Sequence, residues 1–233
     1  METDQDPTEA LDEFTARHLN DWLTPFCQAR GYSHDGFDGR AIRMLSAADA
    51  CDFMQAIDLG LVTHQCGFFS AARSKAKEQI FWQGPRASIP RKVSLWIEPI
   101  ITIGGLRRLH RDFQWPAGQL GLQSKTWAFD LVAYDRTHKL EAVVCEVKKT
   151  EREVEMLLKF MQQHLDTPAD VEMRMRGPER NAFKKVLALR ESASTVFWAL
   201  GPDRYGHVFK VGRNARGAIT LHCATESALE FPG

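Results

Sequence analysis

The chain has 233 residues, of which 44% are hydrophobic and 26% are charged, a composition that suits a globular protein with a sizeable core. Its net charge is zero, no stretch approaches the ~20 apolar residues of a membrane span, and the acidic start over residues 1–7 lacks the basic and then apolar pattern of a secretory signal, so we expect a cytoplasmic protein without a membrane partner. Five cysteines without a C-x-x-C pair and eight histidines without zinc-site spacing argue against a disulfide framework and a structural zinc site.

The N-terminal part, residues 1–90, is expected to be mainly helical. Its first predicted helix has apolar residues at helical spacing, and Pro25 interrupts that pattern. Ser46 stands in the position of an N-cap, with Asp49 three residues later. The predicted elements are a helix over 8–29, a short strand over 41–45, a helix over 46–59, and a helix with a basic face over 70–82.

The remaining part, residues 91–233, is expected to form a core of mixed helices and strands. An amphipathic pattern begins at Ile97 and has Pro99 in its first turn. Thr150 can cap a second helix, because Glu153 follows three residues later. Runs of Val, Leu, Phe and Tyr predict the strands. The predicted elements are a helix over 97–113, strands over 118–122, 127–134 and 140–148, a helix over 150–165, and strands over 195–200, 208–211 and 219–222.

Three charged residues interrupt two of these apolar strands. Asp130 lies within one strand, and Glu146 and Lys148 end the next. Charged side chains in buried strands are seldom there for packing. Glu146 and Lys148 are two residues apart and therefore share a face of their strand, whereas Val147 points to the opposite side, where a core would want it.

The register of the hairpin decides whether Asp130 joins this face. A five-residue loop over 135–139 would set Asp130 opposite Val144, with Glu146 as its diagonal neighbour roughly 7–8 Å away. A two-residue loop would turn Asp130 to the other face, but residues 136–137 are poor formers of such a turn. The longer loop therefore predicts two carboxylates and an ammonium group on one face.

This set of groups suits the hydrolysis of a phosphodiester. Hard oxygen ligands favour Mg²⁺, which keeps several waters and binds substrate phosphate. Such a metal can polarise a phosphoryl oxygen and make a bound water more acidic. The ammonium group of Lys148 can steady that water or the charge that develops on the phosphate. The alternative is a solvent-facing pair of Glu146 and Lys148 at a strand end, with Asp130 at an edge.

Asp130 followed after fifteen residues by Glu146-Val147-Lys148 resembles the motif of the PD-(D/E)XK phosphodiesterase superfamily. The order of elements over about residues 97–200 resembles that family too, although Phe129 stands where the nominal motif has proline. The resemblance implies an α/β (α+β mixed) fold, with a restriction-endonuclease-like core in which a central mixed β-sheet is flanked by helices. Here a mainly helical N-terminal region would precede that core.

The resemblance also implies roles for individual residues. Asp130 and Glu146 would bind Mg²⁺ (or Mn²⁺), the backbone carbonyl of Val147 could add a ligand, and Lys148 would assist the attacking water. Glu98, near the start of the first core helix, is a further candidate ligand. The alternative for Glu98 is a polar residue that favours the helix dipole.

Positive charge gathers in the middle of the chain. Residues 71–125 hold 10 basic and 3 acidic side chains, whereas residues 1–70 hold 4 basic and 12 acidic ones. The basic segment could contact a phosphate backbone, or it could pair with the acidic N-terminal third. Arg107, Arg108 and Arg111 are the candidates for nucleic-acid contacts, with a solvated helix face as the alternative.

We therefore expect a metal-dependent nuclease, an enzyme that hydrolyses the phosphodiester bonds of nucleic acid, with DNA as its substrate. A first alternative is a catalytically silent module of the same fold that binds nucleic acid or a protein partner. A second is an unrelated α+β interaction module. The presence of Asp130, Glu146 and Lys148 together argues against a silent module, which has no chemical need for all three.

Overall fold

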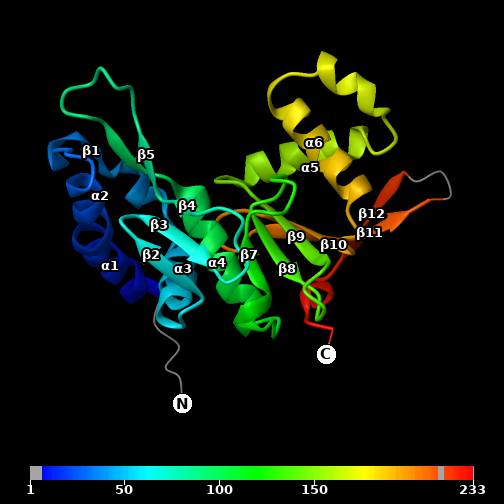
Figure 1. Cartoon of the computed structure of the whole chain (residues 1–233), viewed down its shortest axis with the longest axis horizontal. Coiled ribbons are helices and arrows are strands. Elements are labelled where there is room, and N and C mark those ends of the chain that lie inside the picture. Colours follow the sequence, from blue (N-terminus) through cyan, green and yellow to red (C-terminus); the bar gives the residue numbers. More distant parts are fainter. Residues whose placement is uncertain (1–6, 215–217, 233) are drawn as a thin grey trace.

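The computed structural model describes residues 7–214 and 218–232 and has a mixed α+β fold (Figure 1). Its first three helical segments follow one another almost without a break, and the predicted N-cap Ser46 accepts a hydrogen bond from the backbone amide of Asp49. The predicted helices over 8–29 and 46–59 are thus confirmed. The longer helical segments of this part are α1 (Pro7–Arg17), the π-helical η1 (His18–Leu23), α2 (Thr24–Gln28) and α3 (Ala47–Asp58).

Two small sheets complete the N-terminal part. One has the strand order β1-β6-β5, and the other has the order β2-β3-β4. Their strands are β1 (Phe37–Asp38), β2 (Val62–Gln65), β3 (Phe68–Ala71), β4 (Glu78–Gln79), β5 (Phe81–Gln83) and β6 (Val93–Leu95).

The predicted helix over residues 70–82 is wrong, because this stretch belongs to β3, β4 and β5. Alternate residues of β3 are buried, which is the two-residue period of a strand rather than the period of a helix. The turn before β3 needs Gly67, whose φ is +78° and where a Cβ atom would meet the Phe81 ring at 2.9 Å. The glycine lets the chain reverse and pair β2 with β3.

The predicted strand over residues 41–45 is also wrong. This stretch falls largely within η3 (Gly39–Met44), a 3-10 helix. The side chain of Asp38 caps it by accepting a hydrogen bond from the Arg40 amide at 3.1 Å. The cap satisfies an amide at the helix start, which a strand without a neighbour would leave to solvent.

A six-stranded mixed sheet dominates the second part, with the order β12-β11-β10-β9-β8-β7. Only β9 and β10 are parallel neighbours in it. The predicted strands are confirmed with altered bounds, and β8 is shorter than expected, so that Asp130 immediately precedes it. The strands are β7 (Leu120–Leu122), β8 (Leu131–Tyr134), β9 (Glu141–Val147), β10 (Val196–Leu200), β11 (Gly206–Arg213) and β12 (Ile219–Ala224).

Helices cover both faces of this sheet (Figure 1). The predicted helices α4 (Ile97–Arg111) and α5 (Glu151–Gln163) are confirmed, whereas α6 (Gly177–Glu191) was not among the predicted elements. The cluster on one face joins α4 to the sheet, and the cluster on the other face joins α5 and α6 to it. None of the helices in residues 7–214 and 218–232 combines the length and the apolar content that crossing a membrane requires.

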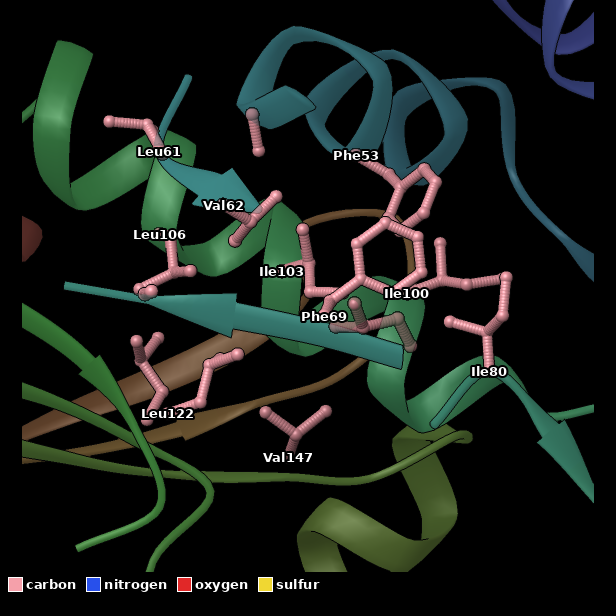
Figure 2. Packing of buried hydrophobic residues seen from close by; sticks show 14 of the residues in the cluster. Phe53, Leu61, Val62, Phe69, Ile80, Ile100, Ile103, Leu106, Leu122 and Val147 are labelled. Carbon is pink, nitrogen blue, oxygen red and sulfur yellow. The ribbon is translucent and has the colours of Figure 1, made fainter. Parts of the chain in front are cut away.

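The two parts of the chain share one hydrophobic core. Figure 2 shows Phe53 of α3 in the same cluster as Ile100 and Ile103 of α4. Val147 enters this cluster from β9, which confirms its predicted direction toward the core. One face of β9 thus packs into the core, and Glu146 and Lys148, on either side of Val147, must point to the opposite face.

A buried histidine lies within the N-terminal core. His18 of η1 is surrounded by the rings of Phe14, Phe37 and Phe81, with centroid distances of 6.1, 4.9 and 5.8 Å. Its Nε2 atom has no hydrogen-bond partner in the described part of the chain. Burial lowers the pKa of His18 to about 4. Protonation therefore favours the unfolded chain as the pH falls from about 6.5 to 4.

We expect His18→Phe to retain the ring packing and to remove this loss of stability. The wild-type free energy of unfolding should fall more steeply between pH 6.5 and pH 4, by about 3 kcal/mol in total relative to the variant. Urea unfolding at pH 7.5, 5.5 and 4 measures the difference, with His34→Phe at an exposed position as the control. Parallel pH profiles for wild type and His18→Phe would contradict the expectation.

Candidate active site

The β8–β9 hairpin places Asp130 beside Glu146. Leu131 pairs with Cys145, and the backbone amide of Asp130 donates to the Cys145 carbonyl at 2.9 Å, which continues the ladder beyond β8. Asp130 therefore lies beside the end of β9, where the negative charge of Glu146 acts on it. The predicted register, with Asp130 opposite Val144, is wrong by two residues.

Two shifts of one residue each explain this correction. The hairpin loop is one residue longer than predicted, because Tyr134 pairs with Glu141 instead of Leu140. A β-bulge then leaves Ala142 unpaired, so that Ala133 pairs with Val143 and the register shifts by one more residue. A single shift would have turned Asp130 to the opposite face. The bulge restores the alternation that brings the two carboxylates together.

Asp130 is held by the neighbouring strand. Its Oδ2 accepts a hydrogen bond from the backbone amide of Val147 at 2.9 Å, and its Oδ1 lies 3.5 Å from Nε2 of Gln123. Gln123 also donates to the carboxylate of Glu78 at 2.9 Å. Burial first, and then the negative charge of Glu146, raise the pKa of Asp130 to about 8.

Glu146 is buried at the end of β9 and contacts two ammonium groups. Nζ of Lys148 lies 2.6 Å from Oε1, and Nζ of Lys185 lies 2.6 Å from Oε2. Lys148 also donates to the backbone carbonyl of Val147 at 2.8 Å. Burial by itself would lower the pKa of Lys148, but the charges of Glu146 and Asp130 outweigh it and raise that pKa. The ammonium group therefore keeps its charge.

Lys185 is a member of this cluster that the sequence did not reveal. It comes from α6, donates to the backbone carbonyl of Ala128, and lies 5.6 Å from the ring centroid of Phe129. A signal for its helix was present, because Pro178 stands near the start of a segment with apolar residues at a three-residue spacing. Nothing in the sequence showed that this helix would cross the end of β9.

A cavity of about 480 Å³ opens at the cluster. The sheet contributes Glu146 and Lys148 to its lining, α5 contributes Leu157, and α6 contributes Lys185. Trp127, from the loop before β8, completes it at the rim. Glu146, Lys148 and Lys185 are thus accessible to a ligand that enters between the two helices and the loop, whereas Asp130 is not among the lining residues.

Glu98 lines the same cavity from the first turn of α4. Its Oε2 accepts a hydrogen bond from the indole Nε1 of Trp96 at 3.1 Å. The charge of Glu98 also contributes to raising the pKa of Lys148, although less than the charges of Glu146 and Asp130. The structure therefore brings Glu98 to the rest of the site.

The three candidate arginines lie elsewhere. Arg107 donates to Gln55 at 2.7 Å and to Asp112 at 2.6 Å, and Arg108 is buried and pairs with Glu226 at 2.7 Å. Neither they nor Arg111 line the cavity. The contacts of Arg107 and Arg108 join α4 to α3 and to the C-terminal segment, which is a structural role.

Two oxygen atoms of this site converge on the ammonium group of Lys148. No group of three or more His, Cys, Asp or Glu side chains in residues 7–214 and 218–232 is arranged to hold a metal. However, Nζ of Lys148, itself a cation, lies within 2.8 Å of both Glu146 Oε1 and the Val147 carbonyl, so two oxygens converge on one point. The buried Oε2 of Glu146 has no hydrogen bond of ordinary geometry. With Asp130 alongside, every donor is an oxygen, as Mg²⁺ prefers.

No family model, curated protein or solved structure matches this chain. Its function is therefore inferred from the chemistry of the site itself.

Proposed function

We propose that the protein is a metal-dependent phosphodiesterase that hydrolyses nucleic acid, with DNA as its substrate. Asp130 and Glu146 would hold Mg²⁺ or Mn²⁺, and Lys148 would assist the attacking water. The observation that carries this proposal is that Glu146, Lys148 and the Val147 carbonyl meet at the end of β9 beside a cavity, with the carboxylate of Asp130 bonded to the Val147 amide. A simple surface pair of Glu146 and Lys148 would not need a third charged group with a perturbed pKa.

The order of the surrounding elements supports the same proposal. The helix α4 is followed by β7, β8 and β9, then by α5, and β10 pairs with β9 in parallel. This is the order expected from the resemblance to PD-(D/E)XK phosphodiesterases, with α6 as an addition between α5 and β10. The cavity lies at the end of β9, where Glu146 and Lys148 line it together with residues of α5.

The residues would divide the chemical work between them. A bound divalent metal would supply polarisation of a phosphoryl oxygen and a more acidic water. Asp130 would give up its proton on binding it, because a nearby cation favours the carboxylate. Lys148 would leave its contact with the converging oxygens and direct its ammonium toward the water or the phosphate. Lys185 would remain paired with the carboxylate of Glu146.

Asp130→Asn tests this proposal directly, because the amide keeps the shape of the side chain and can still accept the hydrogen bond from Val147. We expect wild type to cleave nucleic acid in the presence of Mg²⁺ or Mn²⁺, and we expect cleavage to cease when EDTA removes the metal. The variant should cleave about 10²-fold more slowly or worse and should bind Mg²⁺ more weakly in calorimetry. The matched control is Asp166→Asn, at an exposed aspartate that does not line the cavity.

Cleavage by Asp130→Asn at the wild-type rate would remove this site from the reaction. A wild type that cleaves no DNA or RNA with any metal would favour the second candidate, a catalytically silent module that binds nucleic acid or a protein. One observation favours that candidate: Lys148 and Lys185 already neutralise Glu146 without a metal. Calorimetry separates the two, because a silent module held together by lysines has no need to bind Mg²⁺.

A further inference from the structure

Trp127 is an exposed aromatic side chain at the rim of the cavity. It retains 65% of its accessible surface although most large apolar side chains of the described chain are buried. Its backbone has φ +60°, in the left-handed region that bulky residues seldom adopt. Exposure of a large ring and an unfavourable backbone conformation both cost free energy, which points to a use for this residue outside folding.

The loop that carries Trp127 is firmly held. Ser124 is buried, and its hydroxyl accepts hydrogen bonds from the backbone amides of Ala128 and Phe129, both at 3.0 Å. The amide of Trp127 donates to the Ser124 carbonyl at 3.0 Å. Lys185 of the charged cluster donates to the carbonyl of Ala128. The indole is therefore presented on a fixed turn that is bonded to the candidate active site.

The rest of the cavity combines apolar and cationic groups. Met156, Leu157 and Pro178 supply apolar surface, and the ammonium groups of Lys148, Lys184 and Lys185 lie there beside the carboxylates of Glu98, Glu146 and Glu153. A volume of about 480 Å³ is in the range that encloses one small molecule. A ligand that fits all of these features has a flat ring, an anionic group and the size of one nucleotide.

We infer that the cavity takes one unpaired nucleotide of a single-stranded nucleic acid, with its base stacked on Trp127 and its phosphate among the lysines. This inference rests on the proposed function and specifies its substrate. A base inside a duplex is paired and stacked on its neighbours, so it is not free to enter. A base reaches such a pocket only when it is unpaired. Stacking on an aromatic ring accepts any base, so we expect little sequence preference.

The test is the binding of a fluorescein-labelled 12-residue oligothymidylate and of a blunt duplex of equal length, measured by anisotropy in EDTA so that no cleavage occurs. The single strand should bind more tightly than the duplex. Trp127→Ala should weaken single-strand binding by about 5- to 150-fold, the effect of losing one stacked base. Trp127→Phe should recover part of this loss. The matched control, Trp82→Ala, removes another exposed tryptophan, one that does not line this cavity, and should change nothing.

Equal binding by Trp127→Ala and wild type would overturn the inference, and so would duplex binding as tight as single-strand binding. Its failure is distinguishable from failure of the proposed function. If wild type and Trp127→Ala cleave duplex DNA equally in Mn²⁺, the result supports the proposed nuclease activity and contradicts the proposed single-strand pocket. If single-strand binding depends on Trp127 but no metal supports cleavage, the result supports the single-strand pocket and contradicts the proposed nuclease activity.

Discussion

Lys148→Ala is expected to lower the rate of nucleic-acid cleavage by about 10²–10³-fold while the protein still folds. The ammonium group lies 2.6 Å from Glu146 and 2.8 Å from the Val147 carbonyl, at the point where the oxygens of the site converge. A group that stabilises developing charge there acts most strongly in the transition state. An ordinary exposed ion pair would contribute only about 0–1 kcal/mol, and its loss would leave cleavage unchanged.

The neighbouring Lys149→Ala is the matched control. Lys149 is half-exposed and does not itself line the cavity, and its Nζ lies 3.7 Å from Oε1 of Glu153. The Lys149→Ala variant should cleave at the wild-type rate when metal-dependent cleavage is measured under single-turnover conditions. Lys148→Arg should not restore the rate fully, because a planar guanidinium cannot replace a compact ammonium group. If Lys148→Ala cleaves as fast as wild type, the lysine does not take part in the reaction.

Phe53→Ala is expected to destabilise the protein by about 3–5 kcal/mol, a large share of the stability of an ordinary domain. Phe53 is fully buried in α3, and its ring contacts those of Phe14, Trp22 and Phe69 at centroid distances of 5.6, 5.3 and 5.3 Å. Figure 2 shows it in the cluster that also receives Ile100 of α4. The substitution opens a cavity where the two parts of the chain meet.

Thermal unfolding measures this effect, and the midpoint should fall by about 6–20 °C. Met173→Ala is the control, because this exposed apolar side chain should contribute within ±0.5 kcal/mol. Cleavage per folded molecule at low temperature should stay near the wild-type value. A small change on Phe53→Ala would mean that the cluster between α3 and α4 contributes little to stability.

The site was predictable where its residues are local in sequence. Glu146, Val147 and Lys148 fix their own directions through the period of a strand, and the buried position of Val147 confirms that reasoning. The side of Asp130 was also predictable, but through a register that is wrong by two residues. The longer hairpin loop and the bulge at Ala142 each moved the register by one residue, and the hydrophobic pattern of β9 does not indicate the bulge.

The parts that escaped prediction depend on contacts distant in sequence. Lys185 reaches Glu146 only because α6 packs over the sheet, and no local pattern reports that packing. The basic residues that resembled a helix face, Arg73, Lys75 and Lys77, lie in the connection between β3 and β4. Pairing with neighbouring strands, through the turn at Gly67, decided their conformation. Tertiary context overrode local preference in both cases.

The outer edge of β7 is occupied by the chain itself. The backbone amides of Arg73 and Lys75 donate to the carbonyls of Leu120 and Leu122, each at 2.9 Å. An open edge strand would offer those carbonyls to a strand of another molecule, which is a common beginning of aggregation. Here a strand of a second molecule would first have to displace the segment around Arg73 from these carbonyls. The segment with Arg73 and Lys75, whose basic residues suggested a nucleic-acid contact in the sequence, thus covers the edge of the sheet and hinders self-association.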